Sequence, residues 1–147
     1  MPLPFELRLV EDDGDLRQLI DFMGNTPLDY AGYDEWLRDK LAPRVAEGAA
    51  LAIVGRYEDR VIGNAVLYVT PPASVELKNF RIAGGYGDEG VGSFLWRQAE
   101  VLGCTMLGLR EPAGSAQIRL DTRSTNAASL AFFLTQGCRE LGRTPLY

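Results

Sequence analysis

The chain has 147 residues, of which 46% are hydrophobic and 24% are charged, as in an ordinary globular domain. It contains no histidine, which excludes Ser-His and Cys-His nucleophiles and histidine metal ligands. Cys104 and Cys138 follow no metal-ligand spacing, so we expect free thiols and no metal ion. No apolar run approaches the roughly 20 residues of a bilayer span, and no signal peptide is recognisable. We therefore expect a single cytoplasmic domain, residues 1–147, with no membrane partner.

The net charge of −5 is distributed unevenly. Residues 1–50 hold 11 acidic and 5 basic side chains, whereas residues 51–147 hold 9 and 10. An acidic first third disfavours a general nucleic-acid-binding surface, so no nucleic-acid partner is expected. It is typical either of a solvated acidic face or of a protein that takes a cationic substrate.

The first third of the chain predicts one strand and two helical regions. Residues 5–10 alternate between apolar and polar side chains, which is typical of a strand. Asp15 is the best N-cap candidate for a helix that ends at residues 24–27. The apolar face of that helix consists of Leu16, Leu19, Ile20 and Met23. A second helical region is expected over residues 28–48, with Pro43 kinking or dividing it. Its apolar anchors are Trp36, Leu37 and Leu41.

Aromatic and acidic side chains gather at the start of this second region. They are Asp29, Tyr30, Tyr33, Asp34 and Glu35. Aromatic rings beside carboxylates can line the mouth of an amine-binding site. The same residues are also typical of the solvent-exposed side of a helix, and the sequence leaves both interpretations open.

The middle of the chain predicts a hairpin, a third strand and a helix. Residues 50–54 and 61–69 are apolar strands around a polar turn. Residues 75–82 alternate as a strand, with one face formed by Val75, Leu77, Asn79 and Arg81. Its opposite face is formed by Glu76, Lys78, Phe80 and Ile82. A glycine-dense loop then leads into a helix over residues 91–109.

The last third predicts a strand over residues 117–122, a helix between Asn126 and Gly137, and a last strand over residues 139–147. The element order is therefore β-α-α-β-β-β-α-β-α-β. A hairpin followed by a strand-helix-strand unit predicts the α/β (α+β) class. We expect a central mixed, mostly antiparallel sheet flanked by helices, with one right-handed parallel crossover.

The glycine-dense loop before the helix at Val91 is suited to an anion. Backbone N–H groups at a helix N-terminus can point at a phosphate, and glycines let it approach. Residues 85–90 spell G-x-G-x-x-G, the dinucleotide-binding fingerprint. That fingerprint requires further βαβ units, but only 57 residues follow Gly90 and an antiparallel hairpin precedes it. A dinucleotide site is therefore disfavoured.

Two motifs in a fixed order resemble the GNAT superfamily of acyl-CoA-dependent N-acyltransferases. The first is Gly90-Val-Gly92, which opens a helix directly after a strand. The second runs from Asn126 through two phenylalanines to Gly137. The resemblance covers residues 5–147, most specifically 75–138. It implies a GNAT fold and direct transfer of an acetyl group from acetyl-CoA to a primary amine of a small molecule or peptide.

The resemblance also implies the residues of the site. The pantetheine arm would bond, like an added strand, to the backbone of Phe80, Ile82 and Ala83. The pyrophosphate would bind the N–H groups of Gly87, Asp88, Glu89, Gly90, Val91, Gly92 and Ser93. The CoA arm would further contact Asn126, Ser129, and Phe132 or Phe133. Some family members place a general-base glutamate 14 residues before the glycine pair, which is the position of Glu76 here.

The loop and the C-terminal helix depart from the family pattern. Gly87 replaces the usual Arg or Gln, and the carboxylates of Asp88 and Glu89 would repel a pyrophosphate. Phe133 replaces a frequent general-acid tyrosine, which leaves Tyr86, Tyr147 or water to protonate the thiolate. Many relatives also continue into one more strand, without which a second copy could cover the sheet edge in a homodimer. These departures favour an alternative function, a degenerate GNAT-like domain that binds a protein partner or senses CoA.

Overall fold

The computed structural model describes residues 5–25, 31–70, 74–86, 90–106, 117–121 and 127–142. A five-stranded sheet runs through it in the order β1-β2-β3-β4-β5. The strands are β1 (Phe5–Leu9), β2 (Ala50–Tyr57), β3 (Arg60–Thr70), β4 (Ser74–Ile82) and β5 (Gln117–Leu120). The first three pairings are antiparallel and the last is parallel. The predicted mixed, mostly antiparallel sheet is confirmed.

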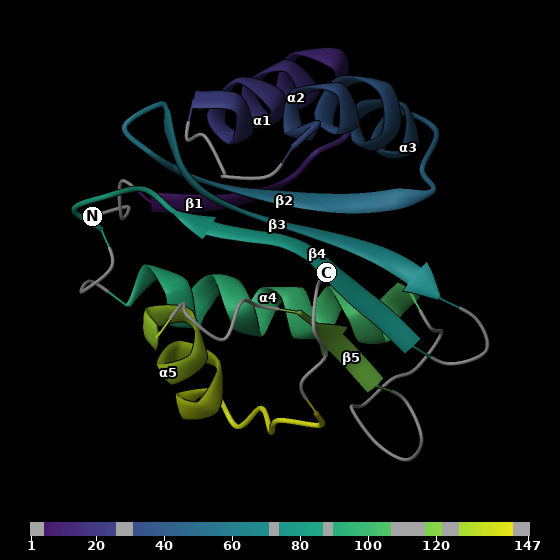
Figure 1. The fold of residues 1–147 in the computed structure, drawn as a ribbon. Helices are drawn as coiled ribbons and strands as arrows, with labels where there is room; N and C mark the ends of the chain where they lie inside the picture. Colours follow the sequence, from purple (N-terminus) through teal and green to yellow (C-terminus); the bar gives the residue numbers. More distant parts are fainter. Residues whose placement is uncertain are drawn as a thin grey trace.

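Helices cover both faces of the sheet (Figure 1). One face carries α1 (Asp13–Asn25), α2 (Tyr33–Trp36), the π-helical turn η1 (Leu37–Leu41) and α3 (Ala42–Ala46). The other carries α4 (Val91–Met106) and α5 (Ala127–Thr135). Each layer has its own apolar core, built around Leu19, Met23 and Leu41 in the first and around Leu67, Leu95 and Ala99 in the second. Among the described residues no helix is both long and apolar enough to cross a bilayer.

The helical region after α1 runs unbroken through Pro43, with a change of helix type in place of a division. The N–H of Ala42 bonds to the carbonyl of Leu37, five residues back, which widens the turn immediately before Pro43. Proline lacks an N–H and its ring crowds the preceding turn, so a π-helical turn there accommodates it. The predicted anchors Leu37 and Leu41 are buried, whereas Trp36 is only half-buried.

The predicted N-cap of α1 is wrong by three residues. Oδ1 of Asp12 accepts the N–H of Asp15 at 2.7 Å, so Asp12 is the cap. Asp15 instead lies buried, with 5% of its surface exposed, and Oδ2 accepts a bond from Nε of Arg8 at 3.1 Å. Its carboxylate therefore joins α1 to β1.

The hairpin turn is tighter than expected, because β2 and β3 extend into the predicted turn from both sides. Only Glu58 and Asp59 lie between the strands, at φ of 48° and 66°. Two successive positive φ values match the twist of a two-residue type I′ hairpin.

The predicted faces of β4 are wrong beyond its middle, because the strand contains a β-bulge. Leu67 pairs with Leu77 while Val66 pairs with Asn79, so Lys78 is an extra residue. Val75 and Leu77 pack toward α4, and after the bulge Phe80 and Ile82 pack into the same core. Glu76, Lys78 and Asn79 all lie on the α1–α3 side instead. The bulge thus gathers three polar side chains on one face.

We expect Gly63→Ala to destabilise the protein. A Cβ at Gly63 would lie 3.0 Å from the carbonyl oxygen of Arg81 and 3.0 Å from Cδ1 of Ile82. A backbone oxygen cannot retreat without disturbing the β3–β4 ladder, so a loss of about 1–3 kcal/mol in the free energy of unfolding is expected. Denaturant unfolding measures it. Gly84→Ala is the control, because a Cβ there meets nothing within 4 Å; equal stability of the two variants would contradict the prediction.

Residues 139–142 form no strand, and the rest of the predicted last strand lies outside the described residues. The expected extension of the long helix to residue 109 also lies outside them, since α4 is described as far as Met106.

Candidate active site

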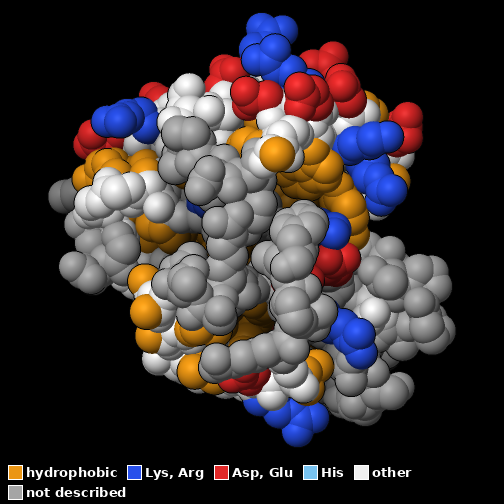
Figure 2. All heavy atoms as spheres, viewed as in Figure 1, with side chains coloured by type: hydrophobic (Ala, Val, Ile, Leu, Met, Phe, Trp, Pro, Cys, Tyr) orange, Lys and Arg blue, Asp and Glu red, His pale blue; other side chains and the backbone are white. Residues whose placement is uncertain are grey.

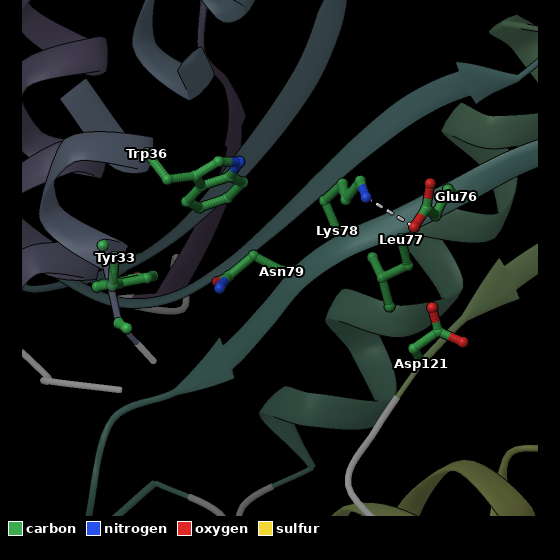
Figure 3. A pocket seen from close by; sticks show the side chains of 9 residues that line it. Tyr33, Trp36, Glu76, Leu77, Lys78, Asn79 and Asp121 are labelled. Atoms are coloured by element: carbon green, nitrogen blue, oxygen red, sulfur yellow. Dashed lines mark ion pairs between the residues drawn. The ribbon is translucent and has the colours of Figure 1, made fainter. Parts of the chain in front are cut away.

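A pocket of about 390 Å³ opens between α2, β4 and the end of β5 (Figure 3). Its lining residues are Ala31, Gly32, Tyr33, Trp36, Glu76, Leu77, Lys78, Asn79 and Asp121. Two carboxylates, one ammonium and one amide therefore face an aromatic wall. The predicted general base, Glu76, lies in this pocket.

Glu76 forms an ion pair within the pocket. Its Oε1 lies 2.8 Å from Nζ of Lys78, and the two side chains are 31% and 34% exposed (Figure 3). The two residues are two positions apart, so ordinary strand alternation places both side chains on the same face. A partly exposed carboxylate beside an amine can exchange a proton with it.

Tyr33 and Trp36 form the opposite wall of the pocket (Figure 3). Their rings stack at 5.9 Å with an interplanar angle of 27°. The Tyr33 hydroxyl donates to the carbonyl of Met23 at 3.1 Å, and the Arg81 guanidinium lies 5.8 Å from the ring centroid. Of the predicted aromatic and acidic mouth, Tyr33 lines the pocket, whereas Asp34 and Glu35 are exposed and Asp29 and Tyr30 lie outside the described residues.

Three polar residues of the pocket were not predicted as site residues: Lys78, Asn79 and Asp121. A hydrogen bond orients the Asn79 side chain, because its Oδ1 accepts from Nδ2 of the fully buried Asn64 at 2.9 Å. A buried asparagine in the middle of an apolar strand was a signal that could have revealed this pair. The sequence carried no signal for the bulge that brings Asn79 to the same face as Glu76 and Lys78.

Beyond the pocket, β4 has an edge without a partner strand in the described part of the chain. Pairing with β5 ends at Leu77 and Leu120. The N–H of Ala83 donates to the carbonyl of Ile62 at 2.7 Å, so Ala83 faces β3. Because successive backbone groups alternate, those of Ile82 and Phe80 point to the open edge. The carbonyl of Ala83 accepts the N–H of Tyr86, so both of its backbone groups are used within the chain.

Two glycines lie at the N-terminus of α4, and each position requires glycine for a different reason. Gly90 has a φ of 75°, which favours glycine, and its carbonyl accepts the N–H of Phe94. A Cβ at Gly92 would lie 3.1 Å from the Phe132 ring, so close packing of α4 against α5 requires this glycine. Val91 is buried and opens the helix, and the hydroxyl of Ser93 accepts a bond from Nε2 of Gln136 at 2.9 Å. Gly87, Asp88 and Glu89 lie outside the described residues.

Four aromatic rings form a cluster between β4, α4 and α5. Phe80 lies 5.5 Å from Phe132 and 5.7 Å from Phe133, and Trp96 lies 5.5 Å from Phe133. This cluster belongs to the α4–α5 core, on the opposite side of the sheet from Glu76. Ser129 is half-buried on α5, and Asn126 lies outside the described residues. Tyr86 packs against Tyr57 at 6.0 Å and is absent from the pocket lining; Tyr147 is not described.

We expect stability to fall in alkaline solution because of two tyrosines near the pocket. Burial raises the pKa of Tyr33 and of Tyr68 above their ordinary value of 10.0. In the unfolded chain these phenols ionise near pH 10, whereas in the folded chain they keep their protons to a higher pH. The free energy of unfolding therefore decreases as pH rises above 10. Denaturant unfolding at pH 8 and pH 11 tests this, and the double variant Tyr33→Phe, Tyr68→Phe should show a smaller decrease; an equal decrease would contradict the assignment.

The acidic first third forms a mixed charged surface. Figure 2 shows Asp and Glu side chains over the α1–α3 layer, interspersed with Lys and Arg. Two acidic side chains of this third form ion pairs with arginines, Asp15 with Arg8 and Glu6 with Arg56.

Comparison with known proteins identifies the fold. No family model matches the sequence, and a search of curated proteins finds no match. Among solved structures, AAC(6')-Iy in complex with a CoA bisubstrate analogue matches with a TM-score of 0.76 at 17% identity, covering 97% of this chain and 96% of that chain. The aminoglycoside 6'-N-acetyltransferase AAC(6')-IG from Acinetobacter haemolyticus gives 0.73 at 16% identity over 97% and 96%. Glucosamine-6-phosphate N-acetyltransferase from Arabidopsis thaliana gives 0.68 at 11% identity over 97% of both chains. The predicted GNAT fold is thereby confirmed.

Proposed function

We propose that this protein, which has the GNAT fold, is an N-acetyltransferase that uses acetyl-CoA to acetylate a primary amine bound in the pocket. One observation carries the proposal: the carboxylate of Glu76 lines a pocket at the point where the described pairing of β4 with β5 ends. A thioester held along the open edge would thus lie beside a base and an amine-sized cavity. The solved neighbours support the proposal, since they are named as N-acetyltransferases and one is bound to a CoA bisubstrate analogue.

The described residues fit a CoA arm in two places. The backbone groups of Phe80 and Ile82 at the open edge can bond an extended amide chain like an added strand. The N–H groups at the start of α4, from Val91 to Ser93, can bond a pyrophosphate, which the helix dipole also favours. The part of this cradle predicted for Gly87, Asp88 and Glu89, and the contact predicted for Asn126, remain proposals without a described geometry.

Different residues of the pocket would bind the substrate and remove its proton during acetyl transfer. When bound, acetyl-CoA supplies an acetyl group activated as a thioester. Glu76, directly or through water, would take a proton from the substrate ammonium and leave a neutral amine able to attack. Asp121 would attract the cationic substrate, and the stacked rings of Tyr33 and Trp36 would hold its apolar or sugar-like body. The departing thiolate would take its proton from water or from the attacking nitrogen, since the phenyl ring of Phe133 has no proton to donate.

Calorimetry with acetyl-CoA and with CoA at moderate salt tests the cofactor site. We expect a dissociation constant in the micromolar range, that is, roughly −8 kcal/mol. A panel of polyamines, amino sugars and short peptides then tests transfer, read out as released thiol. No binding at millimolar ligand would overturn the enzyme proposal and favour the alternative, a GNAT-like module that binds a protein partner. Binding without transfer to any amine would favour a CoA sensor.

A further inference from the structure

The side-chain amine of Lys78 lies at the place where the proposed function puts the amine of the substrate. Its Nζ lies 2.8 Å from Oε1 of Glu76 (Figure 3), and both side chains line the same pocket. The Lys78 side chain is 34% exposed, so it is neither buried in the core nor fully in solvent. Its backbone is the extra residue of the β4 bulge, one position beyond the last residue paired with β5. The amine therefore lies beside both the proposed base and the open edge.

The choice of lysine at this position stands out against the rest of the chain. Of the 15 basic residues, Lys40 and Lys78 are the two lysines, and all the others are arginines. An arginine would also pair with Glu76, but its guanidinium does not lose a proton in proteins and cannot act as a nucleophile. A lysine ammonium can lose a proton, and the neutral amine that results can act as a nucleophile. Lys40 lies exposed on η1, away from the pocket lining.

We propose that Lys78 is a modification site that the protein acetylates itself. The inference rests on the proposed acetyl transfer, with Lys78 as a built-in acceptor. Glu76 takes one proton from the Lys78 ammonium, and the neutral Nζ attacks the thioester carbonyl carbon of acetyl-CoA. The carbon–sulfur bond breaks as the new carbon–nitrogen bond forms, and the nitrogen's second proton goes to the CoA thiolate. The products are Nε-acetyl-Lys78 and CoA-SH, and Glu76 later returns its proton to water.

Acetylation would change the charge of the pocket. The amide carries no positive charge, so the ion pair with Glu76 would be lost, as would the cation 5.5 Å from the Tyr68 ring centroid. Glu76 and Asp121 would then be the charged side chains among the lining residues. The modified pocket would attract an external ammonium more strongly than the unmodified one.

The test is incubation of the purified full chain with acetyl-CoA and no added amine, followed by intact mass and peptide mapping. We expect one acetyl group on Lys78, formed at least tenfold faster than any on Lys40, which serves as an internal reference for uncatalysed acetylation. Lys40→Arg should leave the rate at Lys78 unchanged. Lys78→Arg should abolish the modification, and Glu76→Gln should slow it at least tenfold in a chain whose folding is checked by circular dichroism.

Each other outcome separates this inference from the proposed function. If acetyl-CoA binds and an external amine is acetylated while Lys78 stays unmodified, self-acetylation is overturned and the enzyme proposal stands. If acetyl-CoA does not bind and Lys78 stays unmodified, both fail. Equal rates at Lys40 and Lys78, or an unchanged rate in Glu76→Gln, would show uncatalysed acetylation and would also overturn the inference.

Discussion

Replacing Glu76 with glutamine should lower kcat/KM for acetyl transfer by roughly 10²- to 10⁴-fold, the range typical of losing a general base. Glutamine keeps the size and one acceptor oxygen of the side chain but cannot take a proton. The amine would then have to lose its proton to water before attacking. The loss should therefore appear in kcat, and it should shrink as pH rises and more of the free amine is already neutral.

Cofactor binding separates catalysis from damage to the site. Because Glu76 faces the α1–α3 side and the proposed CoA contacts lie along the β4 edge and at α4, the dissociation constant of acetyl-CoA should stay within about threefold. Glu47→Gln, an exposed glutamate at the end of α3, is the matched control and should retain full activity. Unchanged transfer by Glu76→Gln would remove the base assignment and leave water or Asp121 as the proton acceptor.

The sequence was enough to predict the fold because hydrophobic periodicity and turn residues are local signals. The apolar strands at residues 50–54 and 61–69 and the capped helices each needed only neighbours in sequence to be recognised. The error at Asp15 has a different origin. Several acidic residues could cap α1, and only the tertiary contact with Arg8 shows that the buried Asp15 forms an ion pair instead.

The candidate site could be predicted only in part. The position of Glu76 before the glycine pair pointed to a base, but strict alternation placed it on the same face as Phe80. The bulge at Lys78 reverses that alternation, and it follows from how β3 and β4 pair and not from any local residue preference. Asn79 therefore lies on the same face as Glu76 and Lys78, against the predicted alternation. Asp121 joined them because β5 ends beside β4, a contact between segments far apart in sequence.

The open edge of β4 makes a backbone experiment possible at Ile82. Its N–H points away from β3, because the neighbouring Ala83 donates to Ile62 and successive residues alternate. Proline at position 82 would remove that donor while leaving the β3–β4 ladder bonds intact, the situation in which strands tolerate proline. If the CoA arm bonds this edge, Ile82→Pro should weaken acetyl-CoA binding by roughly 10- to 100-fold. The variant removes one hydrogen bond to the CoA arm, and the proline ring occupies space at the same contact.

Two further variants decide what the proline result means. Ile82→Ala shortens the side chain that packs in the α4–α5 core but keeps the N–H, so it should cost stability while changing the affinity by less than about threefold. Arg81→Pro removes an N–H that faces β3, and it should instead lower the free energy of unfolding, because a ladder bond is lost. Calorimetry and denaturant unfolding on all three give the comparison. Equal affinities for Ile82→Pro and Ile82→Ala would mean that the cofactor does not bond this edge, and the CoA arm would have to be sought elsewhere on the fold.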